Sequence, residues 1–395
     1  MYRIIEFDGR RIEPVWRRLG YLVALVYFTK GKFFKSTNDL AVQFYDFLKD
    51  CNHDKWFYEE GKCNFYSKTP MKKNVAPYYV VLAKTLNLLD ENLLWTPDAQ
   101  TLYFLIDEFQ TACFEKKINF DINRSPLELN LKQRIFFLKK MLEIDGNLLI
   151  PLIIELYHRE KAVFTPERAA EYFLNVIEKF AYRLGRSTLF KDKQLSFLWL
   201  RNVEKWRRML KGERIGKGQS TPELRVNVRL EFLLDLALLG RPIPPDTCYV
   251  TSNAQNIKYL PPKIYTHNLV AFSNIISNGV DGLLIKFYEN ASKIYALPTK
   301  MPSKEIICRD ILDIHDLIQD DIGRALKPVL LDLVCINSLV NEGFIIEEND
   351  IENYLRYMAD NYSGVYTTVD QWGKELFVHI GNELKDKARA TNYKI

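Results

Sequence analysis

The chain has 395 residues, of which 47% are hydrophobic and 13% are aromatic. This composition excludes an intrinsically disordered protein, and the length is enough for about two to four domains with a large core. The nearest candidate for a membrane span, residues 20–28, is much shorter than the roughly 20 residues that cross a bilayer. We therefore expect a buried helix there, no membrane partner and a cytoplasmic protein.

The net charge of +5 conceals a strong asymmetry along the chain. Between Arg183 and Arg229, thirteen basic residues and four acidic ones give a charge of +9. Between Glu305 and Asp360, thirteen acidic residues and four basic ones give −9. A chain this polarised can present one surface to a polyanion and another to a different partner.

Residues 1–118 are predicted to form an N-terminal winged-helix-like domain. The apolar spacing predicts helices over residues 14–28 and 40–48. Pro77 marks the start of a third helix, since proline is favoured at the first helical position. A further helix is expected over residues 101–114.

Two stretches, residues 96–102 and 251–257, share the pattern Thr-x-[Asp/Asn]-Ala-Gln-x-[Leu/Ile]. Each follows a helix-like apolar run that ends in a Leu-Leu pair, at residues 88–89 and 238–239. Such self-similarity indicates that one supersecondary unit is used more than once. The order of the expected elements is that of the last helix and wing of a winged helix-turn-helix. It consists of a helix, an extended connection, a strand end at Trp95-Thr96 and a polar turn.

Residues 127–262 are predicted to form a basic helical and winged-helix domain, after a linker near residues 119–126. Helical periodicity begins near Leu129 and is expected to stop at Asp145-Gly146, before a second helix at 148–157. A capping sequence at Thr165-Pro166 then starts a helix that continues to Tyr182.

The basic stretch contains a helix on which Arg201, Lys205 and Arg208 share one face, and Lys211 extends that face. The side chains expected to pack on the other side are Phe197, Leu198, Leu200, Trp206 and Leu210. A cationic face of this kind binds phosphates with counterion release, so its binding is strongly salt-dependent. The alternative is a solvated surface helix whose charges are paired with acids elsewhere, including those of the C-terminal segment.

The next helix, which starts at Thr221-Pro222, is predicted to be a recognition helix. It carries Arg225, Asn227 and Arg229, and Arg and Asn can pair bidentately with guanine and adenine in the major groove. The complete set of predicted nucleic-acid-binding residues is Arg183, Arg186, Arg201, Lys205, Arg207, Arg208, Lys211, Arg214, Lys217, Arg225, Asn227 and Arg229.

Residues 263–395 are predicted to form an acidic C-terminal winged-helix-like domain. Helices are expected over residues 326–339 and 350–361, with a strand at 344–346 between them. A hairpin of residues 365–369 and 375–380 follows. The predicted fold class is therefore mainly α with small β-wings, in multiple winged helix-turn-helix-like domains.

Catalytic chemistry has one candidate in the sequence. Asp370 with Glu383 and Lys385 matches the loose Asp…Glu-x-Lys spacing of restriction-type nucleases, and Asp107-Glu108 with Glu115-Lys116 repeats it. Glu383 and Lys385 fall on a predicted helix, whereas this set normally lies on a strand. A metal-dependent nuclease is therefore kept as an alternative function.

Cofactor and metal sites are not expected. The glycine-rich span at residues 211–220 departs from the P-loop pattern, because Gly216-Lys217 is followed by glycine instead of Ser or Thr. No Cys-x-x-Cys pair occurs, and the cluster of Cys51, His53 and Cys63 lacks a fourth ligand.

The segments at residues 129–146 and 225–239, with Tyr249-Val250-Thr251, resemble winged-helix proteins of prokaryotic, including archaeal, defence loci. In those proteins an Arg-rich helix that ends in a Leu-Asp-Leu-type turn leads to a strand and a Thr-containing wing. The resemblance covers roughly half of the chain. It implies a DNA-binding partner of an effector nuclease or Argonaute-like protein.

The resulting hypothesis is a non-catalytic nucleic-acid-binding accessory protein that partners an effector in antiviral defence. Double-stranded DNA is preferred over RNA as the ligand. The positive middle of the chain would hold the nucleic acid, and the negative C-terminal third would contact the partner or pack on the basic face. The alternatives are the nuclease and a scaffold that binds only proteins.

Overall fold

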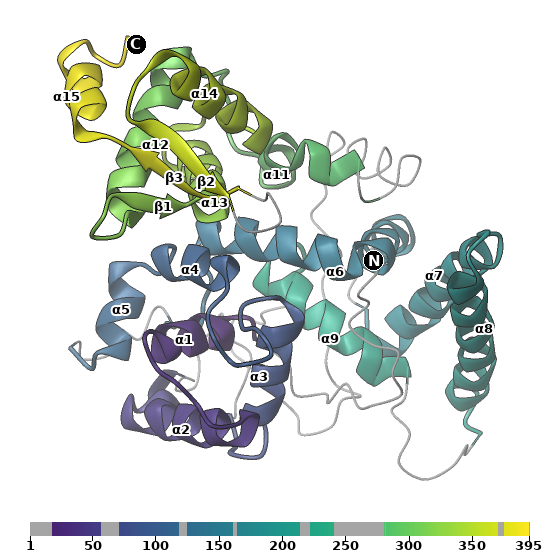
Figure 1. Ribbon diagram of the computed structural model, residues 1–395. Helices are drawn as coiled ribbons and strands as arrows, with labels where there is room; N and C mark the ends of the chain where they lie inside the picture. The colour runs from purple at the N-terminus through teal and green to yellow at the C-terminus, as the bar shows by residue number, and fades with distance from the viewer. Residues whose placement is uncertain are drawn as a thin grey trace.

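The computed structural model describes residues 18–56, 71–117, 125–160, 164–213, 222–240, 280, 282–369 and 375–394. Helices dominate these residues, and three short strands form one antiparallel sheet (Figure 1). The predicted class, mainly α with a small β component, is confirmed.

Within the described residues, the N-terminal part contains five α-helices and a short 3-10 helix at His53–Trp56. These helices are α1 (Gly20–Thr29), α2 (Thr37–Asp50), α3 (Ala76–Thr85), α4 (Pro97–Phe104) and α5 (Glu108–Phe114). Every residue of α1 except Tyr27 is buried, which confirms the expected buried helix. None of the described helices combines the length and the hydropathy that a membrane-spanning segment needs.

The motif that starts at Thr96 begins a helix and does not form a wing. The Thr96 hydroxyl accepts a hydrogen bond from the Ala99 amide, and proline occupies the first position of α4. The expected strand end is reduced to one isolated bridge between Leu89 and Trp95. The single helix expected over residues 101–114 is divided in two, because Asp107 forms a capping box at the start of α5.

The sequence repeat ahead of this motif corresponds to a shared helix ending. After α3, Asn87 adopts a left-handed conformation (φ 59°), and the Leu88 amide donates to the Ala83 carbonyl at 2.8 Å. After α9 (Pro222–Asp235), Ala237 (φ 57°) and Leu238 repeat the same geometry, also at 2.8 Å. Each ending turns its Leu-Leu pair into the core. The second copy of the Thr motif, residues 251–257, lies outside the described residues.

Helix α6 (Leu131–Arg159) runs through the middle of the molecule, with the N-terminal helices on one side and the C-terminal elements on the other (Figure 1). The expected break at Asp145-Gly146 is wrong, since α6 continues through it. Tertiary packing overrides the local turn signal: Asp145 is ion-paired inside the protein, and a Cβ at Gly146 would lie 2.9 Å from Val280.

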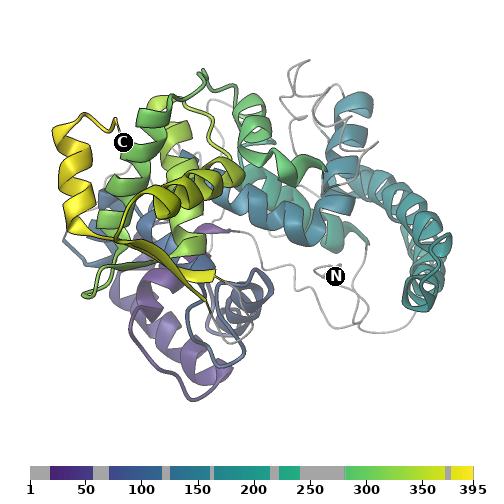
Figure 2. The same cartoon turned by 45° about the horizontal axis from the view of Figure 1, so that its top comes forward.

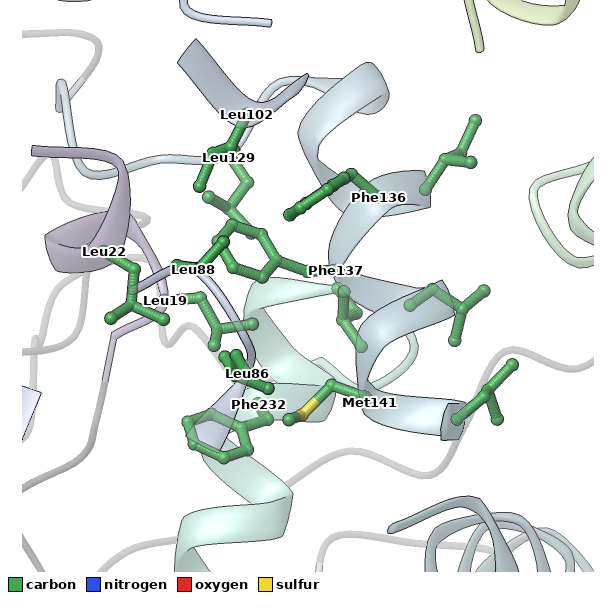
Figure 3. Close-up of a cluster of buried hydrophobic side chains, with 14 of the residues drawn as sticks. Leu19, Leu22, Leu86, Leu88, Leu102, Leu129, Phe136, Phe137, Met141 and Phe232 are labelled. Carbon is green, nitrogen blue, oxygen red and sulfur yellow. The ribbon is translucent and has the colours of Figure 1, made fainter. Parts of the chain in front are cut away.

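One hydrophobic core joins α1, α3, α4, α6 and α9 (Figure 3). The labelled side chains in this region are Leu19, Leu22, Leu86, Leu88, Leu102, Leu129, Phe136, Phe137, Met141 and Phe232. All of them are buried. The N-terminal helices and the middle of the chain are therefore packed against each other through α6.

Two buried ion pairs fix α9 inside this core. Arg229 donates from Nε and Nη2 to the two carboxylate oxygens of Asp145, at 2.6 and 2.9 Å. Arg18 donates to Asp235 Oδ1 at 2.7 Å, and Asp235 Oδ2 accepts from the Leu19 amide at 2.6 Å. Burial raises the pKa of both carboxyl groups, and the arginines oppose this shift.

In its described residues, the C-terminal part contains a three-stranded sheet and several helices. Its elements are α11 (Phe287–Ile294), α12 (Lys304–Ile318), β1 (Arg324–Leu326), α13 (Lys327–Asn337), α14 (Glu348–Asn361), β2 (Val365–Val369), β3 (Glu375–Ile380) and α15 (Asn382–Ala390). The strand order is β1-β3-β2, and both pairings are antiparallel. The central strand β3 places Val378 opposite Ala325 on one side and Thr367 on the other.

The expected C-terminal hairpin is confirmed as β2 and β3, and the expected helices correspond to α13 and α14. The strand expected at residues 344–346 is wrong. Phe344 makes one isolated bridge with Lys300, after a π-helical turn at Ser338–Glu342 that ends at Gly343 (φ 76°). The Lys300 amide donates to the Gly343 carbonyl at 2.7 Å and the Ile345 amide donates to the Lys300 carbonyl at 3.2 Å, so the described pairing is limited to Lys300.

Charged groups also connect α6 to the C-terminal part. Lys139 on α6 donates to Asp332 on α13 at 2.7 Å and also bonds Glu348 on α14. Tyr288 on α11 donates to the same Asp332 carboxylate at 2.9 Å. Burial alone would lower the pKa of Lys139, but the two carboxylates more than reverse this and raise it.

Glu347 is the residue before α14, and its carboxylate reaches the N-terminal end of α11. There it accepts hydrogen bonds from the amides of Glu289 at 2.8 Å and Tyr288 at 3.3 Å. Burial raises the pKa of its carboxyl group to about 7, and these amides only partly oppose the shift. Ionisation of Glu347 above neutral pH therefore lowers the free energy of unfolding.

The buried pair of Asp145 and Arg229 predicts a large loss of stability when one partner is removed. We expect Asp145→Ala to lower the free energy of unfolding by about 3–5 kcal/mol, because a guanidinium stays buried without its carboxylate. Chemical denaturation measures this change. The control Glu213→Ala breaks the exposed pair with Arg208 and should cost at most about 1 kcal/mol. Equal effects of the two substitutions would contradict the prediction.

Glu347 predicts a stability that depends on pH. A carboxyl group whose pKa is raised on folding does not change the free energy of unfolding below pH 4.5. It lowers this free energy increasingly as the pH rises to about 7. Glu347→Gln should therefore lose less thermal stability between pH 5 and pH 8 than the wild type. Melting temperatures across this range test the prediction. The exposed control Glu383→Gln should keep the wild-type slope, and a parallel Glu347→Gln curve would refute the assignment.

Candidate nucleic-acid interface

Helices α7 (Pro166–Gly185) and α8 (Phe190–Leu210) form a hairpin that projects from one end of the molecule (Figures 1 and 2). Helix α7 packs against α6 and α9, and α8 packs along α7. The inner face of α8 consists of Ser196, Trp199, Val203 and Trp206, which recur every three or four residues and are all buried. The hairpin therefore exposes most of the remaining α8 surface.

The packed side of α8 differs in part from the prediction. Trp206 is buried as expected, but Phe197 is 68% exposed and Leu198 is 51% exposed. Trp199 packs on Phe180 of α7 and Trp206 lies under Arg225 of α9, so Phe197 and Leu198 point away from this packed side. The outer surface of the hairpin thus mixes apolar and cationic side chains.

The structure brings three of the predicted cations together on α8. Arg201, Lys205 and Arg208 all line one groove along α8, which has a volume of about 410 Å³. Arg208 also pairs with Glu213 at 2.6 Å, and Glu204 lies on the same groove. Three cations against one lining carboxylate leave this groove positive.

The other predicted cations of the hairpin divide into two groups. Arg183, Arg186 and Lys211 are exposed. Arg207 donates to both oxygens of Glu178 on α7, at 2.9 and 2.6 Å, and so fastens α8 to α7. The groups available to a ligand are therefore the first three and the groove cations. Arg214 and Lys217 lie outside the described residues.

The predicted recognition helix, α9, lies in the interior. Asn227 and Arg229 are each only 3% exposed, and Arg229 is bound to Asp145. The Arg225 guanidinium lies over the Trp206 ring, 4.6 Å from its centroid, and is half-buried. The assignment of Asn227 and Arg229 to nucleic-acid contact is therefore wrong, because buried side chains cannot reach the base edges of a duplex.

The acids of the C-terminal third do not cover the basic hairpin. Asp316 pairs with Lys385 at 2.6 Å, Asp320 with Arg324 at 2.9 Å, and Glu352 with Lys327 at 3.0 Å. No ion pair joins this third to α8 within the part of the chain that the structure describes, and the two lie at opposite ends of the molecule (Figures 1 and 2). The interpretation in which the acidic segment packs on the basic face is therefore wrong.

Two of the residues proposed for metal-dependent cleavage serve structural roles. Lys385 is buried on α15 and paired with Asp316, and Asp107 caps α5. His, Cys, Asp and Glu side chains nowhere gather in groups of three or more that suit a metal ion, as far as the described residues extend. Asp370 and Cys63 lie outside them.

Comparisons with protein-family models, with curated proteins and with solved structures found no match. The Tyr249-Val250-Thr251 part of the defence-locus resemblance also falls outside the described residues. Functional proposals for this chain therefore rest on its own surface chemistry, above all on the α7–α8 hairpin.

Proposed function

We propose that this chain is a non-catalytic nucleic-acid-binding protein that holds duplex DNA on its α7–α8 hairpin. The observation that carries the proposal is the groove with Arg201, Lys205 and Arg208 on a projecting helix. A helix rises 1.5 Å per residue, so these cations extend over about 10 Å, close to three base-pair steps of 3.4 Å. The row can therefore follow one phosphate backbone, with Lys211 continuing it.

We further propose that residues 304–380 form a winged helix that contacts a protein. The order α12-β1-α13-α14-β2-β3, with the sheet order β1-β3-β2, supports this interpretation. Helix α14 would take the position of the recognition helix, but it carries four acids against one arginine. Phosphates repel such a helix, so a protein is the better partner.

The identity of that partner is part of the same proposal. The resemblance to winged-helix proteins of defence loci suggests an effector nuclease or Argonaute-like protein and a role in antiviral defence. The limits 1–118, 127–262 and 263–395 are kept as proposed domains. A protein-only scaffold is the second candidate, and the exposed Phe197 and Leu198 favour it because large apolar side chains are typical of protein interfaces.

Mobility shift of a duplex at several salt concentrations tests nucleic-acid binding. We expect the triple variant Arg201→Ala, Lys205→Ala, Arg208→Ala to bind more weakly than the wild type. Its slope of log K against log salt should be shallower by about two to three, because each lost phosphate contact removes about 0.9. Circular dichroism checks that the variant is folded.

A matched control removes three other exposed lysines, Lys35, Lys72 and Lys73, which lie in the N-terminal part. This control changes the net charge by the same amount but should keep the wild-type slope. Equal losses in the two triple variants would show that the α8 groove is not the binding site, and a wild type that does not bind would favour the protein-only scaffold.

The nuclease alternative predicts a different result. Plasmid incubated with the protein and Mg²⁺ or Mn²⁺ should remain uncut if the chain is non-catalytic. Metal-dependent cleavage that is lost in Glu383→Gln would instead support the nuclease. Cleavage that persists in this variant would point to the second set, Asp107-Glu108 with Glu115-Lys116, or to a contaminating enzyme, which a mock preparation without this protein can identify.

A further inference from the structure

A second cationic site lies between α6 and α7, away from the α8 groove. This pocket has a volume of about 560 Å³, within the range of roughly 300–1,000 Å³ that is typical of small-molecule sites. Its floor is apolar and is formed by the buried side chains of Ile150, Ile154, Val176 and Val280. Gly146 also lines the pocket, where it packs so closely on Val280 that a Cβ would lie 2.9 Å from the valine side chain.

One edge of the pocket is cationic. Lys179 and Arg183 line it from one face of α7, and Arg186, the residue that caps the end of this helix, lines it beside them. Lys179 pairs with Glu155 at 2.8 Å. Within the described residues, no carboxylate lies at ion-pair distance from Arg183 or Arg186, and both are exposed. Two guanidinium groups are therefore open to an anion.

The opposite edge offers hydrogen-bonding groups on α6. Asn147 lines the pocket, and so does Pro151, four residues later. Because proline has no N–H, the Asn147 carbonyl cannot make its helical hydrogen bond to residue 151. The carbonyl and the side-chain amide of Asn147 together supply acceptors and donors for a polar ligand.

An aromatic side chain completes the rim. Tyr182 lies on α7 beside Arg183 and is 56% exposed, so its ring can stack on a planar group. A fatty acid would use the apolar floor and the cationic edge, but it would leave Asn147 without a partner. A ligand with an anionic end, a flat apolar body and a polar far edge uses all three surfaces.

We propose that this pocket binds a nucleoside phosphate. The phosphate lies on Arg183 and Arg186, the base lies over the apolar floor beside Tyr182, and the polar edge of the base faces Asn147. The ligand comes either from a free nucleotide or from the unstacked terminal nucleotide of a strand. This site is separate from the duplex-binding groove on α8 and does not require it.

Isothermal titration with adenosine 5′-monophosphate tests the site in the full chain. We expect Arg183→Ala with Arg186→Ala to weaken binding about tenfold to a hundredfold, because two charge-assisted contacts are lost. Lys191→Ala with Lys193→Ala removes the same charge from exposed positions nearby that do not line the pocket. This matched control should bind within about twofold of the wild type.

A second variant separates recognition of the base from recognition of the phosphate. Asn147→Ala should weaken adenosine 5′-monophosphate but leave the weaker binding of inorganic phosphate unchanged. A fluorescent 12-nucleotide strand, with and without a 5′-phosphate, then distinguishes the sources of the ligand. Binding of the mononucleotide assigns the site to free nucleotides, and binding of only the phosphorylated strand assigns it to strand ends.

Several results would overturn the proposal. These are no binding of either probe, equal losses in the two double variants, and laurate binding that adenosine 5′-monophosphate does not displace. The triple variant of Arg201, Lys205 and Arg208 should bind the mononucleotide normally. Failure of the pocket and failure of duplex binding on α8 can therefore be told apart.

Discussion

Charged side chains buried along α6 must be paired, and this requirement determines how the other helices lie on it. Asp145 forms an ion pair with Arg229 on α9, Lys140 with Asp98 on α4, and Lys139 with Asp332 on α13. An unpaired charge inside the protein costs several kcal/mol, so an arrangement that separates these partners is strongly disfavoured. The N-terminal helices, α9 and α13 therefore all pack on α6, and the α7–α8 hairpin projects from one end of the molecule (Figure 1).

Features that depend on neighbouring residues could be predicted from the sequence. The hairpin of β2 and β3, the buried α1 and the common face of Arg201, Lys205 and Arg208 follow from local periodicity. The continuity of α6 through Asp145 could not be predicted in this way. Its stabilising partner, Arg229, is 84 residues away in the chain, and a local Asp-Gly signal contains no information about it.

The candidate site was predictable to a similar extent. Helix α8 has four consecutive apolar residues, Phe197 to Leu200, so several faces of it look equally suited to packing. Trp199 and Trp206 determine which face of α8 is buried, because they are its largest side chains. They lie four residues before and three residues after Val203, so all three share one face. In α9, the sequence suggested that Arg229 contacts DNA bases. Arginine is common both on nucleic-acid-binding surfaces and in buried ion pairs, and the residue type alone does not distinguish them. The pocket between α6 and α7 had no sequence motif, since its polar and cationic edges come from two different helices.

The packing of Trp199 on Phe180 and the ion pair of Arg207 with Glu178 hold the two helices of the hairpin together. The row of cations along α7 (Lys179 and Arg183, with Arg186 after the helix) therefore keeps its position relative to the row on α8 (Arg201, Lys205 and Arg208). A nucleic acid long enough to reach both rows would bind its second contact as an intramolecular event, at a high effective concentration. Avidity of this kind would make the hairpin sensitive to strand length, because a short fragment could occupy only one row at a time.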